Sequence, residues 1–302
     1  MPWVVGIDEA GYGPNLGPLV QCAVAVDLPA DDLAGWRTTR SQIRRAAEPD
    51  DGRVLVDDSK KVYAGAGGFL RLEQGFSAIL GPPAGTLGEW LGAVGLPWTK
   101  DDVEAEHWHD LVERLPLFPC ERRLSLNAKL IAVNVVPTVL FNRVVAGSNS
   151  KATLLSSGLI ELLKASCRAL PVEEPLEFFC DKHGGRNFYG PMLQGAFPDG
   201  WPVAEAESAD ESRYRIEALD RPVRVTVRPR ADSGSIAVAL ASMVAKYVRE
   251  VSMGQFNRFW LKHVPDLPPT AGYPVDAKRF YAAIRPAMER MKLEEDRVWR
   301  CR

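Results

Sequence analysis

The stretch WVVGIDEAGYGPNLGPLV, residues 3–20, decides how this chain folds. An apolar run of valine and isoleucine, typical of a buried β-strand, leads straight into two adjacent carboxylates, Asp8 and Glu9. A loop of glycines and prolines follows, and the valine-rich run at 19–26 predicts a second strand beside the first. The acidic pair is therefore expected where a buried strand of a sheet ends.

Composition excludes several classes of protein. With 302 residues, 46% of them hydrophobic, the chain can bury a sizeable core, and a net charge of −2 limits any nucleic-acid surface to a local patch. The five cysteines are scattered and never spaced CxxC, which argues against a disulfide framework or a thiolate zinc site. No signal peptide is recognisable, and the longest apolar stretch, 130–141, is too short to span a bilayer. We expect a cytoplasmic protein without membrane contact.

The rest of the chain alternates strand and helix signals, which favours an α/β fold. The apolar run 176–180 predicts a strand that ends on Asp181, and a hairpin is expected over 214–227. Asp232 comes just before the most helical stretch of the chain, which is predicted over 235–256, and a final helix is expected from about residue 276. The uneven segment 64–128 is interpreted as an insertion and not as a separate domain.

Four acidic residues thus come where predicted elements end: Asp8, Glu9, Asp181 and Asp232. If these elements lie side by side in one sheet, the carboxylates meet at one edge, where ligands of α/β proteins bind. Oxygen ligands without histidine or cysteine select Mg²⁺ or Mn²⁺. Taken singly, each has a plainer explanation, a solvated strand end or, for Asp232, a helix N-cap whose amides favour the ionised form.

Several motifs, in order, resemble those of the type 2 ribonucleases H (HII and HIII). The matching segments are IDEAG at 7–11 with Gly13-Pro14 and Gly17-Pro18, DSKK at 58–61, KATLL at 151–155, ADS at 231–233 with the alanine-rich 236–246, Arg249-Glu250, and GYP at 272–274. The segment after Asp181 matches only loosely, so this residue is placed by its position at a strand end. The motifs run over nearly the whole chain.

The resemblance implies an RNase H-like mixed five-stranded sheet flanked by helices, in a single domain spanning residues 1–302. Insertions would fall at about 64–128 and 184–213, with a helical C-terminal part at about 255–302. Because the first motif begins at residue 8, we expect the HII-like layout without an additional N-terminal domain. A monomer is favoured.

The resemblance also implies the chemistry. Asp8, Glu9, Asp181 and Asp232 would be the catalytic, metal-binding tetrad, holding two divalent ions, Mg²⁺ or Mn²⁺, for hydrolysis of a phosphodiester. The substrate would be an RNA/DNA hybrid or a DNA duplex that contains ribonucleotides. The expected substrate-binding residues are Gly11, Tyr12, Gly13, Lys60, Lys61 and Tyr273.

One residue departs from the family pattern. The middle of the glycine loop is usually arginine or lysine, but here it is Tyr12, which brings no positive charge toward a phosphate. The tyrosine either stacks on a sugar or packs on the neighbouring loop. Two alternatives therefore stay open: a nuclease of the same fold with a changed substrate, and an inactive homologue that only binds nucleic acid.

Overall fold

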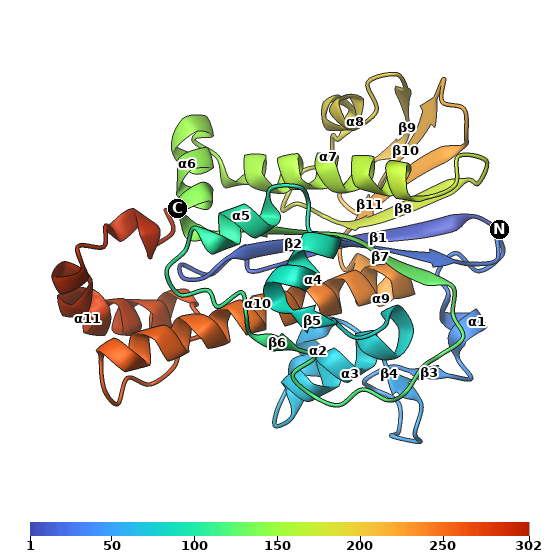
Figure 1. Cartoon of the computed structure of the whole chain (residues 1–302). Helices are drawn as coiled ribbons and strands as arrows, with labels where there is room; N and C mark the ends of the chain where they lie inside the picture. The colour runs from blue at the N-terminus through green and yellow to red at the C-terminus, as the bar shows by residue number, and fades with distance from the viewer. Residues whose placement is uncertain (302) are drawn as a thin grey trace.

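A computed structural model describes residues 1–301 and contains one large mixed sheet (Figure 1). Its seven strands run in the spatial order β7-β2-β1-β8-β11-β10-β9. Their bounds are β1 (Trp3–Ala10), β2 (Leu19–Asp27), β7 (Ala128–Val136), β8 (Leu176–Asp181), β9 (Trp201–Glu207), β10 (Ser212–Glu217) and β11 (Val223–Arg228). Strands β1, β8 and β11 are parallel neighbours, and the other pairs are antiparallel.

The sheet has seven strands, so the prediction of five was wrong. The expected hairpin is confirmed as β10 and β11, but β10 also pairs with β9, which lies inside the segment 184–213. β9 reads WPVAEAE, and its proline, alanines and glutamates give little strand signal. Pro202, which has no backbone N–H, is tolerated because β9 is the edge strand and its outer side has no partner strand to bond with.

Helices cover the two faces of the sheet (Figure 1). The long ones are α3 (Gly68–Leu80), α6 (Thr138–Ser148), α7 (Lys151–Ala169), α10 (Ile236–His263) and α11 (Pro274–Met291). The short ones are α1 (Trp36–Thr39), α2 (Ser59–Tyr63), α4 (Leu87–Val94), α5 (Thr99–Glu104), α8 (Gly190–Ala196), α9 (Ala231–Gly234) and the 3₁₀ turn η1 (Glu295–Arg297). Two small ribbons pair β3 (Ile43–Arg44) with β4 (Val54–Leu55) and β5 (Gly85–Thr86) with β6 (Arg114–Leu115).

Strand β1 is buried on both faces. Its successive side chains point in opposite directions and therefore enter two different apolar clusters. Val4 packs in the cluster formed with α10 and α3, whereas Val5 and Ile7 pack in the cluster formed with α7. Several residues of the segment 64–128, among them Phe76 and Trp90, belong to the same cluster as Val4. This segment therefore shares the core of the sheet.

The alanine-rich start of α10 lies unusually close to β1. Gly6 faces this helix, and a Cβ atom built on it would be 2.1 Å from the carbonyl carbon of Ala237. Small residues on both elements permit this approach. It places α10 alongside Asp8, two residues further along the same face of β1.

The C-terminal helices form their own apolar cluster. The end of α10 packs on α11 through Phe256, Trp260, Phe280 and Ile284, which confirms the expected last helix. Helix α10 reaches His263, seven residues beyond the predicted end at Phe256. Among residues 1–301, no helix is long and apolar enough to cross a membrane.

Candidate active site

The topology brings the predicted carboxylates to one place. In the parallel pairs, Ile7 lies beside Cys180, and Arg228 beside Asp181, so Asp8 and Asp181 stand at the same level of adjacent strands. Asp232 follows β11 by four residues, in α9. This is the edge of a sheet at which α/β proteins bind ligands.

Asp8 is buried, and it is held from two sides. Its Oδ1 accepts a hydrogen bond from the Glu9 amide at 2.8 Å, and its carboxylate also hydrogen-bonds with Ser242 of α10. The Ser242 and Ser59 hydroxyls share a further hydrogen bond at 3.0 Å. Burial, and then the charges of Glu9 and Asp181, raise the pKa of Asp8 well above its usual value.

Glu9 belongs to the same electrostatic cluster. Burial, and then the charge of Asp181, raise the pKa of Glu9 to about 7, although the positive charge of Lys60 acts in the opposite direction. Lys60 also opposes the rise in the pKa of Asp181. The Glu9 and Asp181 carboxylates therefore interact electrostatically. Lys60 lies near enough to offset part of their repulsion.

Asp181 ties β8 to the loop that carries Asp232. Its Oδ1 accepts a hydrogen bond from the Ala231 amide at 3.1 Å. Burial raises the pKa of Asp181, and backbone hydrogen bonds, that of Ala231 first, partly offset the rise. This aspartate, predicted from its strand end alone, thus lies beside the start of α9.

The predicted environment of Asp232 was wrong in one respect. It does not cap α10, whose N-cap is Ser235, but lies inside the separate turn α9. Burial, and then the charge of Asp58, raise its pKa, and the Ser233 amide, 2.7 Å from Asp232 Oδ1, only partly offsets this. The surroundings therefore disfavour the ionised form that a helix N-terminus was expected to favour.

Asp58, which the sequence analysis did not single out, lies next to the candidate site. It caps α2, with its Oδ1 accepting from the Lys60 amide at 2.8 Å, and its charge acts on Asp232. It belongs to the DSKK segment at 58–61, in which only the two lysines were predicted to bind substrate. The charge of Lys60 acts on Glu9 and Asp181, and that of Lys61, whose Nζ lies 3.2 Å from Asp57 Oδ1, acts on Asp232.

The donor set fits a hard divalent cation. Burial raises the pKa values of Asp8, Glu9, Asp181 and Asp232, and the charges of neighbouring carboxylates add to the rise at Asp8, Glu9 and Asp232. As they stand, no three histidine, cysteine, aspartate or glutamate side chains within residues 1–301 are grouped closely enough to hold an ion. A cation bound among these carboxylates would lower their pKa values.

The glycine loop lies at the end of β1. Gly11 and Gly17 have φ values of +89° and +80°, which side chains rarely adopt. Gly13 is exposed, and a Cβ atom there would meet nothing within 4 Å. The backbone of the loop is therefore open to a ligand at Gly13.

Tyr12 is partly buried. It packs against the apolar cluster that contains Leu19 and Phe141, and the Lys151 ammonium lies 5.9 Å from the centroid of its ring. Burial, and then the charge of Glu9, raise the pKa of its hydroxyl. The interpretation that Tyr12 packs on neighbouring structure therefore has direct support, and Lys151 brings a positive charge to it.

The GYP segment lies against the same loop. The Asn15 amide donates to the Gly272 carbonyl at 2.8 Å, and Tyr273, which precedes α11, is 50% exposed. The fold thus brings Tyr273 to the glycine loop with Gly11, Tyr12 and Gly13, although the loop and Tyr273 are about 260 residues apart in sequence. An exposed ring in this position is available for stacking.

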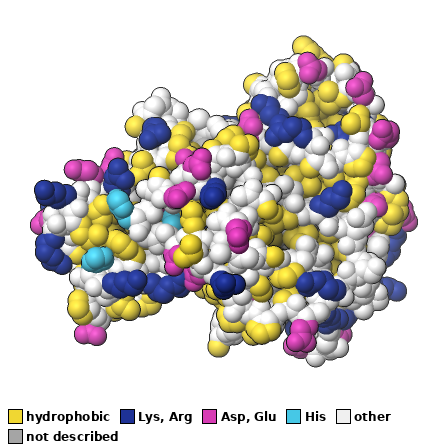
Figure 2. All heavy atoms as spheres, viewed as in Figure 1, with side chains coloured by type: hydrophobic (Ala, Val, Ile, Leu, Met, Phe, Trp, Pro, Cys, Tyr) yellow, Lys and Arg dark blue, Asp and Glu magenta, His cyan; other side chains and the backbone are white. Residues whose placement is uncertain are grey.

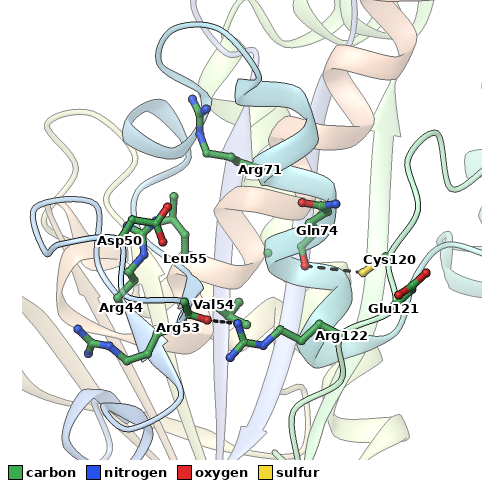
Figure 3. A pocket seen from close by; sticks show the side chains of 12 residues that line it. Arg44, Asp50, Arg53, Val54, Leu55, Arg71, Gln74, Cys120, Glu121 and Arg122 are labelled. Carbon is green, nitrogen blue, oxygen red and sulfur yellow. Dashed lines mark hydrogen bonds and ion pairs between the residues drawn. The ribbon is translucent and has the colours of Figure 1, made fainter.

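A separate cavity of about 360 Å³ lies between β4, α3 and the segment around Arg122 (Figure 3). It contains none of the four carboxylates, and its arginines are largely engaged: Arg44 pairs with Asp50 at 3.0 Å, and Arg122 donates to the Gly52 carbonyl. Figure 2 shows the Lys and Arg side chains of one face in small groups among acidic and uncharged side chains. This agrees with the net charge of −2.

Comparisons with family models and with curated protein sequences gave no match. Among solved structures, ribonuclease H2 from Pyrococcus horikoshii OT3 is similar, with a TM-score of 0.52 and 14% identity over 98% of this chain and 92% of that one. Ribonuclease HII from Archaeoglobus fulgidus, solved in complex with PCNA, gives a TM-score of 0.46 and 16% identity over 99% and 94%. Bst ribonuclease HIII, solved with Mn²⁺, gives 0.45 and 17% over 99% and 66%. The chain has the fold of the type 2 ribonucleases H.

Proposed function

We propose that this chain is an endonuclease that hydrolyses the RNA strand of RNA/DNA hybrids, or ribonucleotides within duplex DNA. The observation that carries the proposal is the meeting of Asp8, Glu9, Asp181 and Asp232 at one edge of a type 2 ribonuclease H fold. Nothing in binding a polyanion calls for carboxylates there unless cations join them. Their pKa values are raised, by burial first, as is common for groups at functional sites.

The four carboxylates would hold two divalent ions, Mg²⁺ or Mn²⁺. When bound, such ions supply an activated water and stabilise the leaving oxygen of a phosphodiester. Ser242 and the Glu9 amide fix the direction of the Asp8 carboxylate, and the Ala231 amide does the same for Asp181. Asp58, whose charge raises the pKa of Asp232, would add negative charge for a cation at this end of the set.

The other predicted residues would hold the nucleic acid. The open backbone at Gly13, with Gly11 and Tyr12 next to it in the loop, would approach the sugar and phosphate next to the scissile bond. Lys60, beside Glu9, and Lys61, near Asp232, would attract the phosphate. The half-exposed ring of Tyr273 would stack on a sugar or base.

Cleavage of three substrates tests this proposal: an RNA/DNA hybrid, a DNA duplex with one ribonucleotide, and an all-DNA duplex. With Mg²⁺ or Mn²⁺ we expect the wild type to cut at least one of the first two and to leave the third intact. Asp8→Asn should lose this cleavage by a factor of about 10³ or more, because a ligand charge is removed. Asp199→Asn, at an exposed aspartate outside the candidate site, is the matched control. Undiminished cleavage by Asp8→Asn would rule out the tetrad.

A second candidate is a nuclease of this fold with a changed substrate. The observation that favours it is Tyr12, which is uncharged and packs on the cluster around Phe141. Cleavage of a substrate other than the two ribonucleotide-containing ones by the wild type, lost in Asp8→Asn, would support it. Binding of a hybrid without turnover in either metal would instead indicate an inactive homologue.

A further inference from the structure

We propose that Arg300 is a positioning residue for the glycine loop, a role that rests on the proposed function of this loop in holding substrate. Its guanidinium lies beneath the loop and donates to three carbonyl groups. Nη1 is 2.6 Å from the oxygen of Gly11 and 3.3 Å from that of Gly17, and Nη2 is 3.3 Å from that of Tyr12. One side chain from the C-terminal end of the chain therefore holds both ends of the loop.

The guanidinium is firmly placed. Arg300 is 1% exposed, and its charged group lies over the ring of Phe141, 3.8 Å from the centroid. Its own amide donates to the Asn15 carbonyl at 2.9 Å. The backbone on either side is held by Asn142, whose Oδ1 accepts from the Cys301 amide at 2.7 Å and whose Nδ2 donates to the Trp299 carbonyl at 2.8 Å.

These contacts fix the direction of the loop amides. In a planar trans peptide, the carbonyl of one residue and the N–H of the next point in opposite directions. Since the carbonyls of Gly11 and Tyr12 point down to Arg300, the N–H groups of Tyr12 and Gly13 point away from it. Within residues 1–301 neither amide has a hydrogen-bond acceptor, and Gly13 is exposed. Arg300 thus aims two donors outward.

The same residue places positive charge under the loop. Burial, and then the charge of Arg249, lower the pKa of Arg300 to about 9, so the two guanidinium groups lie close together. Arg249 is buried as well, and a Cβ atom on Gly11 would be 2.5 Å from its Nε. Position 12 offers a neutral tyrosine, so the positive charge near the loop comes from these two arginines and from Lys151 beside the Tyr12 ring.

The alternative is that Arg300 only anchors the C-terminus. If Arg300 were only an anchor, its substitution would lower the stability of the protein but would leave the loop and the affinity for substrate unchanged. A positioning residue would change the affinity and the loop with little effect on the chemical step. The two roles are therefore separated by KM against kcat and by the local motion of the loop.

The test compares Arg300→Met, which removes charge and hydrogen bonds, with Arg300→Lys, which keeps the charge but not the three-way contact. The matched control is Arg297→Met, at an exposed arginine of the same segment. On whichever ribonucleotide-containing substrate the wild type cleaves, Arg300→Met should raise KM about tenfold or more and change kcat less than about threefold. Arg300→Lys should fall between Arg300→Met and wild type, and Arg297→Met should match wild type.

Hydrogen exchange gives a readout that needs no activity. The Asn15 and Leu16 amides, which donate to the Gly272 carbonyl, should exchange about tenfold faster in both Arg300 variants, while the amides of β1 keep their protection. Wild-type KM and exchange in Arg300→Met would overturn the role of Arg300. If Arg300→Met does not fold, Arg300→Lys decides by the same two criteria. If the wild type cleaves nothing, the proposed function fails, and exchange alone still decides whether Arg300 positions the loop.

Discussion

Gly6 of β1 and Ala237 of α10 are in backbone contact, so close that a Cβ atom on Gly6 would be 2.1 Å from the Ala237 carbonyl carbon and 2.4 Å from its oxygen. The contact sets how α10 lies on the sheet. Because of it, Ser242 reaches Asp8, two residues beyond Gly6 on the same face of β1. A glycine that makes no contact with the carboxylates therefore determines their surroundings.

Gly6→Ala should destabilise the protein by about 3 kcal/mol, because neither the strand nor the helix backbone can move aside without disturbing the core. Urea unfolding measures the loss. Gly147→Ala in α6 is the control, since a Cβ atom there meets nothing within 4 Å, and this change should be neutral or stabilising by about 0.5 kcal/mol. Equal stability of the two variants would show that α10 does not lie against β1 in this way.

Stability without metal should fall as the pH rises from about 6.5 to about 7.5, above the range in which His183, whose pKa burial lowers to about 4, contributes in the opposite direction. The folded-state pKa of Glu9 is raised to about 7 from an unfolded value near 4.5, and that of Asp8 is raised as well. Between these pH values the folded state binds more protons than the unfolded state, so unfolding becomes easier as the pH rises. Thermal unfolding in a metal chelator across this range should show the decline, and added Mg²⁺ should reduce it. A rise in stability over this interval would contradict the crowding of these carboxylates.

Asp8→Asn should make the metal-free protein more stable at pH 7.5 while abolishing cleavage. The amide removes one buried charge from the neighbourhood of Glu9 and Asp181, and its oxygen can still accept from the Glu9 amide. We expect a gain of about 1 kcal/mol or more in the free energy of unfolding, measured in a chelator. Mg²⁺ should stabilise the wild type and not this variant, and a variant less stable than the metal-free wild type would speak against repulsion among the carboxylates.

Ser242→Ala should weaken the response to metal. The Ser242 hydroxyl lowers the pKa of Asp8 by hydrogen bonding, so its loss should disfavour the ionised ligand. The metal concentration for half-maximal cleavage should rise about fivefold, as expected for one hydrogen bond of about 1 kcal/mol. Ser252→Ala, in the same helix, removes a buried hydroxyl that bonds only to the Val248 carbonyl and should leave the response unchanged. The same response in both variants would exclude a role of Ser242 at the site.

Much of the sheet and the position of the acidic residues could be predicted from the sequence, because both depend on local patterns. Buried strands are indicated by the valines of β1 and β2 and by the compact apolar run of β8. Carboxylates that follow such strands must lie at the edge of the sheet. Edge strand β9 could not be predicted, since its formation depends on pairing with β10 and not on its own residues.

The role of Arg300 could not be predicted from the sequence either. Nothing local marks an arginine near the chain end, and its importance comes from packing on Phe141 and on a loop nearly 290 residues away. The surroundings of Asp232 were misjudged for a similar reason, because the separate turn α9 and the neighbouring Asp58 arise only when the chain folds. Contacts made by tertiary packing set these features.

Tyr12→Arg should change substrate choice. The side chain at position 12 lies beside Lys151 and packs on the cluster that includes Phe141, so an arginine there would have to extend outward, toward the side on which the Gly13 backbone is open. One added phosphate contact should steepen the plot of log affinity against log salt by roughly one unit. Cleavage of the single-ribonucleotide duplex relative to the hybrid should rise about tenfold, since a contact next to the ribose matters most when only one ribose is present.

Tyr12→Phe separates packing from hydrogen bonding at the same position. If Tyr12 only packs, removal of its hydroxyl should leave both the salt dependence and the ratio of the two substrates at their wild-type values. A large loss of cleavage in Tyr12→Phe would show instead that the hydroxyl touches the substrate. Unchanged ratio and salt slope in Tyr12→Arg, with Tyr12→Phe also unchanged, would mean that the residue at position 12 does not take part in choosing the substrate, and that the charge beneath the loop from Arg300 and Arg249 suffices.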